Sequence, residues 1–198
     1  MADVHAQAMH ANHGLRLLSR RQDRSASAAT LVREIASNGD LVVVPDVPIN
    51  MAAFNPGIAS DIMAYNPQVD RWVIGGHSVG GAMAARYTGN HADVIEGLVI
   101  WASYPPNSTD LSGLDIPLVS IYGSREKRVN ESSVGERKHL LPAKTRYARI
   151  EGGNHHQFGS YEIDATDHLA TISRESQHQQ IIAATMPLLE AASNLPAE

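Results

Sequence analysis

Ser78 lies in a short segment, Gly76-His77-Ser78-Val79-Gly80, in which glycines stand on both sides of a serine. Apolar residues precede the segment and small helix-forming residues follow it, which predicts a strand, a sharp turn and a helix. The glycines would let the turn lift the serine hydroxyl clear of the sheet, as in the G-x-S-x-G nucleophile elbow. The backbone N–H of Val79 would then face negative charge developing on a substrate. The alternative is a tight strand–helix joint in which Ser78 caps the helix and does no chemistry.

A serine hydroxyl becomes an effective nucleophile only when a base takes its proton and an acid orients that base. Candidates for both roles follow later predicted strands, in the order serine, acid, base. Glu126 follows a strand predicted at residues 116–123, and His155 and His156 follow a strand predicted at residues 145–153. Because the carboxyl ends of parallel strands share one edge of a sheet, we expect these side chains to meet there.

Each candidate has a structural alternative. Glu126 lies in the charged stretch SREKR, where it could be a solvated surface residue. Asp164 and Asp167 follow the histidines, against the order expected for the acid. The chain holds ten histidines, and His155 and His156 compete for the role of base.

Nucleotide binding explains the glycines less well. A dinucleotide-binding turn requires the spacing G-x-G-x-x-G and an acidic residue at the end of the next strand. The segment GGHSVGG has a different spacing, the next strand ends in IWASYPP, and the lysine of a phosphate-binding loop is absent.

The elements that must position these residues alternate between strands and helices. The predicted strands are residues 14–18, 41–45, 71–76, 94–103, 116–123 and 145–153, and the predicted helices are 28–40, 57–67, 78–90, 131–142 and 171–193. Crossovers of this length predict an α/β fold with a mostly parallel sheet and helices on both faces. The continuously apolar run at residues 41–44 predicts a strand buried on both faces. We expect a poorly defined N-terminal segment over residues 1–24 and a single domain over residues 25–198.

The composition of the chain limits the cellular locations and the classes of partner that we expect. A net charge of −5 gives no electrostatic reason to expect a nucleic-acid partner. The absence of cysteine excludes disulfides and thiolate metal sites and fits a reducing, cytoplasmic location. The first residues lack the pattern of a secretory signal, and the longest apolar runs are too short to span a membrane, so we expect no membrane partner.

Five segments together resemble a bacterial α/β-hydrolase family of the dienelactone-hydrolase-like or carboxylesterase type: RWVIGGHSVGGAMAARY, GLVIWASYP, IYGSREKRV, LPAKTRYARIEGGNHHQFGSY and ATISRESQ. The resemblance covers residues 28–189. It implies the α/β-hydrolase fold, Ser78 as nucleophile and the histidine after GGN, His155, as base. Glu126 stands where the family usually has an aspartate, and a glutamate side chain reaches farther. Chemistry carried out by these three side chains requires no metal and no organic cofactor.

The front of the chain departs from the family pattern, so we expect the first strands of the fold to be missing or degenerate. The family has a loop resembling FYPGGKVDP, whose backbone N–H helps to form the oxyanion hole, where this chain has LLSRRQDRS at residues 17–25. One set of codons for this peptide, read one base later, encodes FYPGGKID, so we hypothesise that the segment is out of frame. The second oxyanion donor would then come from around Ser19 and Arg20. Missing edge strands would expose apolar surface, which favours instability or a homo-oligomer.

The reaction expected from these residues is hydrolysis of a small-molecule carboxylic ester through an acyl-enzyme. Phe54, Trp101, Tyr104 and Phe158 follow strand ends or the histidine loop and would line an apolar pocket, although ordinary core packing explains them equally well. One alternative function is a catalytically impaired or non-catalytic protein on the same fold. Another is an acyltransferase that passes the acyl group to an alcohol other than water.

Overall fold

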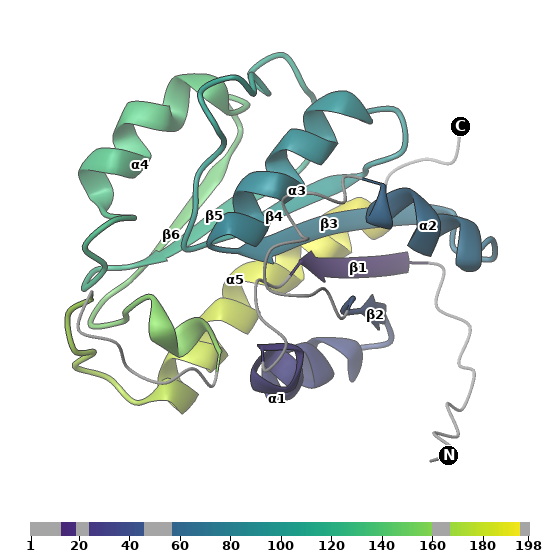
Figure 1. Ribbon diagram of the computed structural model, residues 1–198. Helices are drawn as coiled ribbons and strands as arrows, with labels where there is room; N and C mark the ends of the chain where they lie inside the picture. Colours follow the sequence, from purple (N-terminus) through teal and green to yellow (C-terminus); the bar gives the residue numbers. More distant parts are fainter. Residues whose placement is uncertain (1–12, 19–23, 46–56, 160–166, 195–198) are drawn as a thin grey trace.

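The computed structural model describes residues 13–18, 24–45, 57–159 and 167–194, and Figure 1 shows their arrangement. The strands are β1 (His13–Leu18), β2 (Leu41–Val43), β3 (Arg71–His77), β4 (Gly97–Trp101), β5 (Leu118–Gly123) and β6 (Arg146–Ile150). The helices are α1 (Arg24–Ala36), α2 (Ile58–Tyr65), α3 (Val79–Asn90), α4 (Glu131–Arg137) and α5 (Arg174–Ser193), with short 3₁₀ turns η1 (Lys138–Leu140) and η2 (His156–Phe158). No helix within these ranges is long and apolar enough to cross a membrane.

The strands form one parallel sheet in the order β2-β1-β3-β4-β5-β6. From β1 the chain runs first to β2 on one side, and then returns to β3 on the other side and continues to β6. The direction of winding therefore switches between β1 and β3, and parallel sheets bind ligands at the carboxyl ends of the strands beside such a switch. Ser78 directly follows β3, so the candidate nucleophile stands at this point of the fold.

Two apolar layers enclose the sheet, because successive strand residues point to opposite faces. One layer contains Val73 and Val99 together with residues of α1 and α5, and the opposite layer contains Ile74 and Ile100 together with residues of α2 and α3. Figure 1 shows α1 and α5 on one side of the sheet and α2, α3 and α4 on the other. The predicted parallel sheet with helices on both faces is confirmed.

The prediction that residues 41–44 form a strand buried on both faces is wrong. Strand β2 covers residues 41–43, it is only half-buried, and it stands at the edge of the sheet. An apolar run indicates a strand, but its degree of burial depends on its place in the sheet order.

Strand β1 lies inside the stretch for which a poorly defined N-terminal segment is predicted. It pairs with β2 on one side and with β3 on the other, and Leu18 is the register partner of Gly76. The strand predicted at residues 14–18 is therefore an inner strand of the sheet, and it ends at Leu18, opposite Gly76.

Candidate active site

The serine turn has a backbone conformation that few residues adopt. Ser78 joins β3 to α3 with φ 57° and ψ −126°, a positive φ that strains a residue with a side chain. A Cβ atom at Gly76 would overlap the backbone carbonyl group of Gly80, and one at Gly81 would lie 2.7 Å from the carbonyl oxygen of Gly76. The glycines therefore let β3 and α3 approach closely enough for the turn.

Ser78 holds its place through its backbone rather than through a helix cap. Its N–H donates to the carbonyl oxygen of Trp101 at the end of β4, at 3.0 Å. Its side chain makes no capping hydrogen bond to α3, although Ser78 occupies the capping position. This geometry does not support the alternative in which the serine serves only as a cap.

Glu126 is a buried carboxylate and not a solvated loop residue, with 4% of its surface exposed. Its Oε1 atom accepts the backbone N–H of Gly123 at 2.7 Å, and its Oε2 atom lies 3.0 Å from Nδ1 of His155. Burial raises the pKa of this carboxyl, and the contacts with His155 and Gly123 oppose that rise because they favour the charged form.

The two histidines differ in their partners. Nδ1 of His155 is within hydrogen-bond distance of Glu126, and the His155 side chain keeps about a quarter of its surface exposed. Nδ1 of His156 lies 3.7 Å from the nearer carboxylate oxygen of Asp167, which is longer than a hydrogen bond. The structure thus brings Glu126 and His155, the candidate acid and base that the sequence pairs, within hydrogen-bond distance of each other.

The ring of His155 packs beside the serine turn. Its centroid lies 4.4 Å from that of His77, the residue directly before Ser78. The other neighbour of the His77 ring is Phe158 of η2, stacked at a centroid distance of 5.5 Å. These contacts bring the loop after β6 against the end of β3, with His155 beside the residue that precedes the candidate nucleophile.

The loops that carry the acid and the base are in direct backbone contact. The N–H of Arg125 donates to the carbonyl oxygen of Gly153, and the N–H of Ser124 donates to that of Ile150, both at 2.9 Å. A Cβ atom at Gly123 would overlap the backbone of Gly153, so this approach requires glycine.

Two polar residues that sequence reasoning missed fix the base loop to α5. Gln177 is fully buried; its Oε1 accepts the N–H of Asn154 at 3.1 Å, and its Nε2 donates to the Asn154 carbonyl at 2.8 Å. The Asn154 side chain accepts the N–H of Gln157 and donates to the carbonyl of His168. Asn154 directly precedes His155 in the sequence, and this adjacency could have indicated its role. Nothing in the sequence distinguishes Gln177.

Asp167 also lies in this region. It follows the histidines in the sequence, whereas the acid of the expected order precedes them. Its carboxylate accepts the backbone N–H groups of His155 and Lys127. It therefore contacts the base loop and the acid loop without replacing Glu126 at the imidazole.

The predicted pocket residues lie in different surroundings. Trp101 and Phe158 are core residues with 1% of their surface exposed. Tyr104 is half-buried, packs on the cluster of Tyr122, Val129 and Val134, and lies under the guanidinium group of Arg137 at 4.9 Å. Phe54, like the predicted oxyanion residues Ser19 and Arg20, lies outside the residues that the structure describes.

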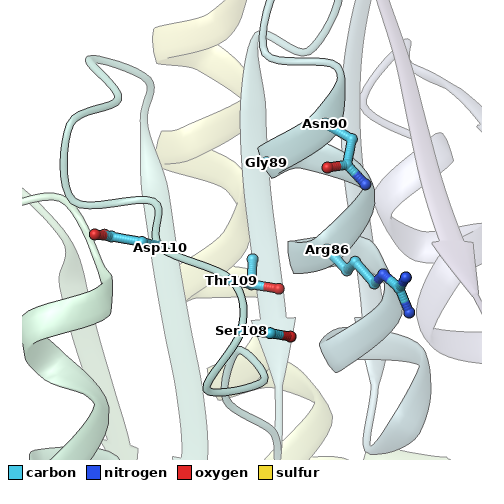
Figure 2. Close-up of a pocket in the computed structure, with 6 residues that line it drawn as sticks. All are labelled: Arg86, Gly89, Asn90, Ser108, Thr109 and Asp110. Atoms are coloured by element: carbon cyan, nitrogen blue, oxygen red, sulfur yellow. The ribbon is translucent and has the colours of Figure 1, made fainter.

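A polar cavity of about 290 Å³ lies elsewhere, and Figure 2 shows the residues that line it. It lies between the carboxyl-terminal half of α3 and the segment at residues 108–110, whereas Ser78 precedes the amino end of the same helix. None of the predicted site residues lines it, so this cavity is not the candidate active site. No group of three or more histidine and carboxylate side chains suited to a metal ion occurs in the described ranges.

The chain belongs to the alpha/beta hydrolase family, whose model matches residues 21–179. The predicted α/β-hydrolase fold is thereby confirmed. A comparison with curated protein sequences finds no match.

Solved structures share the fold. The chain is 18% identical to a predicted CIB-like hydrolase from Thermoplasma acidophilum, with a TM-score of 0.69 over 89% of this chain and 87% of the other. It is 12% identical to a pyrethroid hydrolase from Sphingobium faniae, with a TM-score of 0.66 over 92% and 99% of the two chains. It is 13% identical to a monoacylglycerol lipase from Paleococcus ferrophilus, with a TM-score of 0.61 over 86% and 92%.

Proposed function

We propose that this member of the family is a serine hydrolase that cleaves carboxylic esters, with Ser78 as nucleophile, His155 as base and Glu126 as acid. The observation that carries the proposal is the contact between Glu126 and His155, made beside the strained serine turn. A lipase is among the proteins of similar fold, and ester hydrolysis is the reaction that its name denotes.

In the proposed mechanism the Ser78 hydroxyl attacks the acyl carbon while Nε2 of His155 takes its proton. Glu126 holds the proton on Nδ1 and stabilises the imidazolium that forms. When the tetrahedral intermediate collapses, the C–O bond of the ester breaks and Nε2 gives its proton to the departing alcohol. A water molecule then attacks the acyl-enzyme by the same path, with His155 again as base, and releases the acid.

The developing oxyanion needs N–H donors near Ser78. The N–H of Val79 lies at the first position of α3, where the helix dipole also favours negative charge. A second donor would come from around Ser19 and Arg20, because the strand before them ends at Leu18, the register partner of Gly76. Loss of one such donor costs about 10²–10³ in rate.

The amino-acid sequence of residues 17–25 therefore affects the rate of the proposed reaction, because the second oxyanion donor would lie there. We propose that they are translated out of frame. The coding sequence tests this directly: a one-base shift that restores the two glycines of the family loop supports it, and a sequence in which no such shift exists rejects it.

The proposed partner is a small-molecule ester. The net charge of −5 argues against a nucleic-acid partner, and the lack of cysteine fits a cytoplasmic location. Half-buried Tyr104, at the carboxyl edge of the sheet, offers an apolar surface to the acyl or alcohol group.

Labelling with a fluorophosphonate and hydrolysis of a short-chain p-nitrophenyl ester test the proposal. The wild-type protein should react with both, and Ser78→Ala should lose labelling and about 10⁶-fold in kcat. Ser108→Ala, a change at an exposed serine, should keep both activities. A folded wild-type protein that neither labels nor hydrolyses would show a non-catalytic relative, and an acyl product formed on an added alcohol in preference to water would show an acyltransferase.

A further inference from the structure

Asp167 joins the two loops that carry the acid and the base. Its Oδ1 atom accepts the backbone N–H of Lys127, the residue after Glu126, at 3.0 Å. Its Oδ2 atom accepts the backbone N–H of His155 at 2.8 Å. Each oxygen of one carboxylate therefore holds one loop.

These bonds form a closed ring of contacts. From Glu126 the ring passes through the side-chain contact to His155, through the His155 N–H to Asp167, and through the Lys127 N–H back to the peptide next to Glu126. Only 6% of the Asp167 side chain is exposed. Its bond to His155 is partly buried, whereas its bond to Lys127 lies at the surface. A charged acceptor also makes these bonds stronger than those between neutral groups.

The other bonds between the loops do not hold the same atoms. The direct backbone bonds join residues 124 and 125 to residues 150 and 153, before the acid and the base. Gln177 and Asn154 fix the base loop to α5 and leave the acid loop untouched. Among the described residues, Asp167 is the side chain that bonds both to His155 itself and to the peptide adjoining Glu126.

We propose that Asp167 is a positioning residue that sets the distance and the alignment between Glu126 and His155. The inference rests on the proposed function for its effect on rate, but the geometry that it describes exists whether or not the protein hydrolyses esters. Asp167 touches neither the reacting atoms nor the substrate in this role, and acts through the imidazole that it holds.

Asp167→Ala and Asp167→Asn test the role, with Asp110→Asn as a matched control because Asp110 also accepts a backbone N–H, that of Ser112. With a p-nitrophenyl ester, Asp167→Ala should lower kcat by about 10²-fold and leave KM nearly unchanged, as expected when a catalytic group is misplaced. Asp167→Asn keeps one acceptor oxygen and should lose less. The control should behave like the wild-type protein.

A double-mutant cycle separates positioning from general stability. If Asp167 acts through the bond between Glu126 and His155, then Asp167→Ala should cost at most about threefold in kcat once Glu126→Gln has removed that bond. Full additivity of the two losses would overturn the inference. If both Asp167 variants fail to fold, by circular dichroism, the residue is structural and the inference is also overturned.

A readout that needs no activity keeps the inference distinct from the proposed function. Long-range ¹H–¹⁵N spectra report which ring nitrogen of each histidine carries the proton. His155 should carry it on Nδ1 in the wild-type protein and lose that preference in Asp167→Ala. If the wild-type protein proves inactive, a changed His155 spectrum still supports the role of Asp167, and an unchanged one overturns it.

Discussion

Nδ1 of His155 lies 3.0 Å from Oε2 of Glu126, and the other oxygen of that buried carboxylate accepts the N–H of Gly123. A glutamine at this position would keep the shape of the side chain but present either the wrong charge or the wrong hydrogen-bonding atom to the imidazole. Glu126→Gln should therefore lower kcat by up to about 10⁴-fold, the loss that follows when the base is held in the wrong tautomer. Ester hydrolysis at saturating substrate measures this loss.

Glu136→Gln provides the control for that measurement, because Glu136 is an exposed carboxylate on α4. It should retain the wild-type rate. A Glu126→Gln protein that hydrolyses within a few-fold of the wild-type rate would show that another group orients the base.

The same carboxyl makes stability depend on pH. Burial raises the pKa of Glu126 above its ordinary value of 4.5. Above that pH the folded protein still holds a proton that the unfolded chain has released, so the contribution of Glu126 to the free energy of unfolding falls as pH rises through the window between the two values. Glu126→Gln has no charge to bury there, and its stability relative to wild type should increase as pH rises.

Denaturation by urea at a series of pH values from 4.5 upward measures how the two free energies of unfolding change. A stability of Glu126→Gln relative to wild type that stays constant, or that falls with rising pH, would contradict the prediction.

The close approach of β3 and α3 predicts a large cost for any side chain at Gly76. A methyl group there would overlap the backbone of Gly80, which has no flexible side chain that could move aside. Gly76→Ala should destabilise the protein by about 1–3 kcal/mol or more. Gly135→Ala is the matched change, because Gly135 lies in α4 and a methyl group there would meet no atom within 4 Å, and it should stabilise by up to about 1 kcal/mol. Equal midpoints of thermal unfolding for the two variants would exclude this explanation of the glycine.

Loss of the Gln177 side-chain amide should lower both the stability and the activity of the protein. In Gln177→Met both the N–H and the carbonyl of Asn154 lose their partner, and each unsatisfied buried group costs about 1–3 kcal/mol. The base loop should loosen, so the free energy of unfolding and kcat should fall together. Gln180→Met, on the exposed side of α5, should change neither. Chemical denaturation and ester hydrolysis measured on the same samples decide the point.

The sequence predicted Ser78, Glu126 and His155 correctly as residues of the same sheet edge, because glycines and strand ends are local signals. Ser78 and Glu126 follow strands with clear apolar runs, whereas His155 follows the more polar strand RYARI. Parallel strands bring their carboxyl ends together. The roles of the three residues remain a proposal, while their placement is a property of the fold.

Other features depend on contacts that no local pattern encodes. Asp167 lies twelve residues beyond His155, and its bonds to both loops are tertiary contacts that its place in the sequence does not indicate. The half-burial of β2 follows from its edge position, which the length of its apolar run does not reveal. Trp101 and Phe158 follow strand and loop ends, as pocket residues would, yet they pack inside the core, because an apolar side chain suits either place.

The positive φ of Ser78 has a consequence for how this chain can diverge. A glycine at position 78 would adopt the same turn without a side chain to strain it, so Ser78→Gly should fold more stably than wild type even though it has no hydroxyl. Selection for stability alone would therefore favour replacement of Ser78 by glycine. A lineage that keeps a serine at this position accepts a less stable fold than glycine would give.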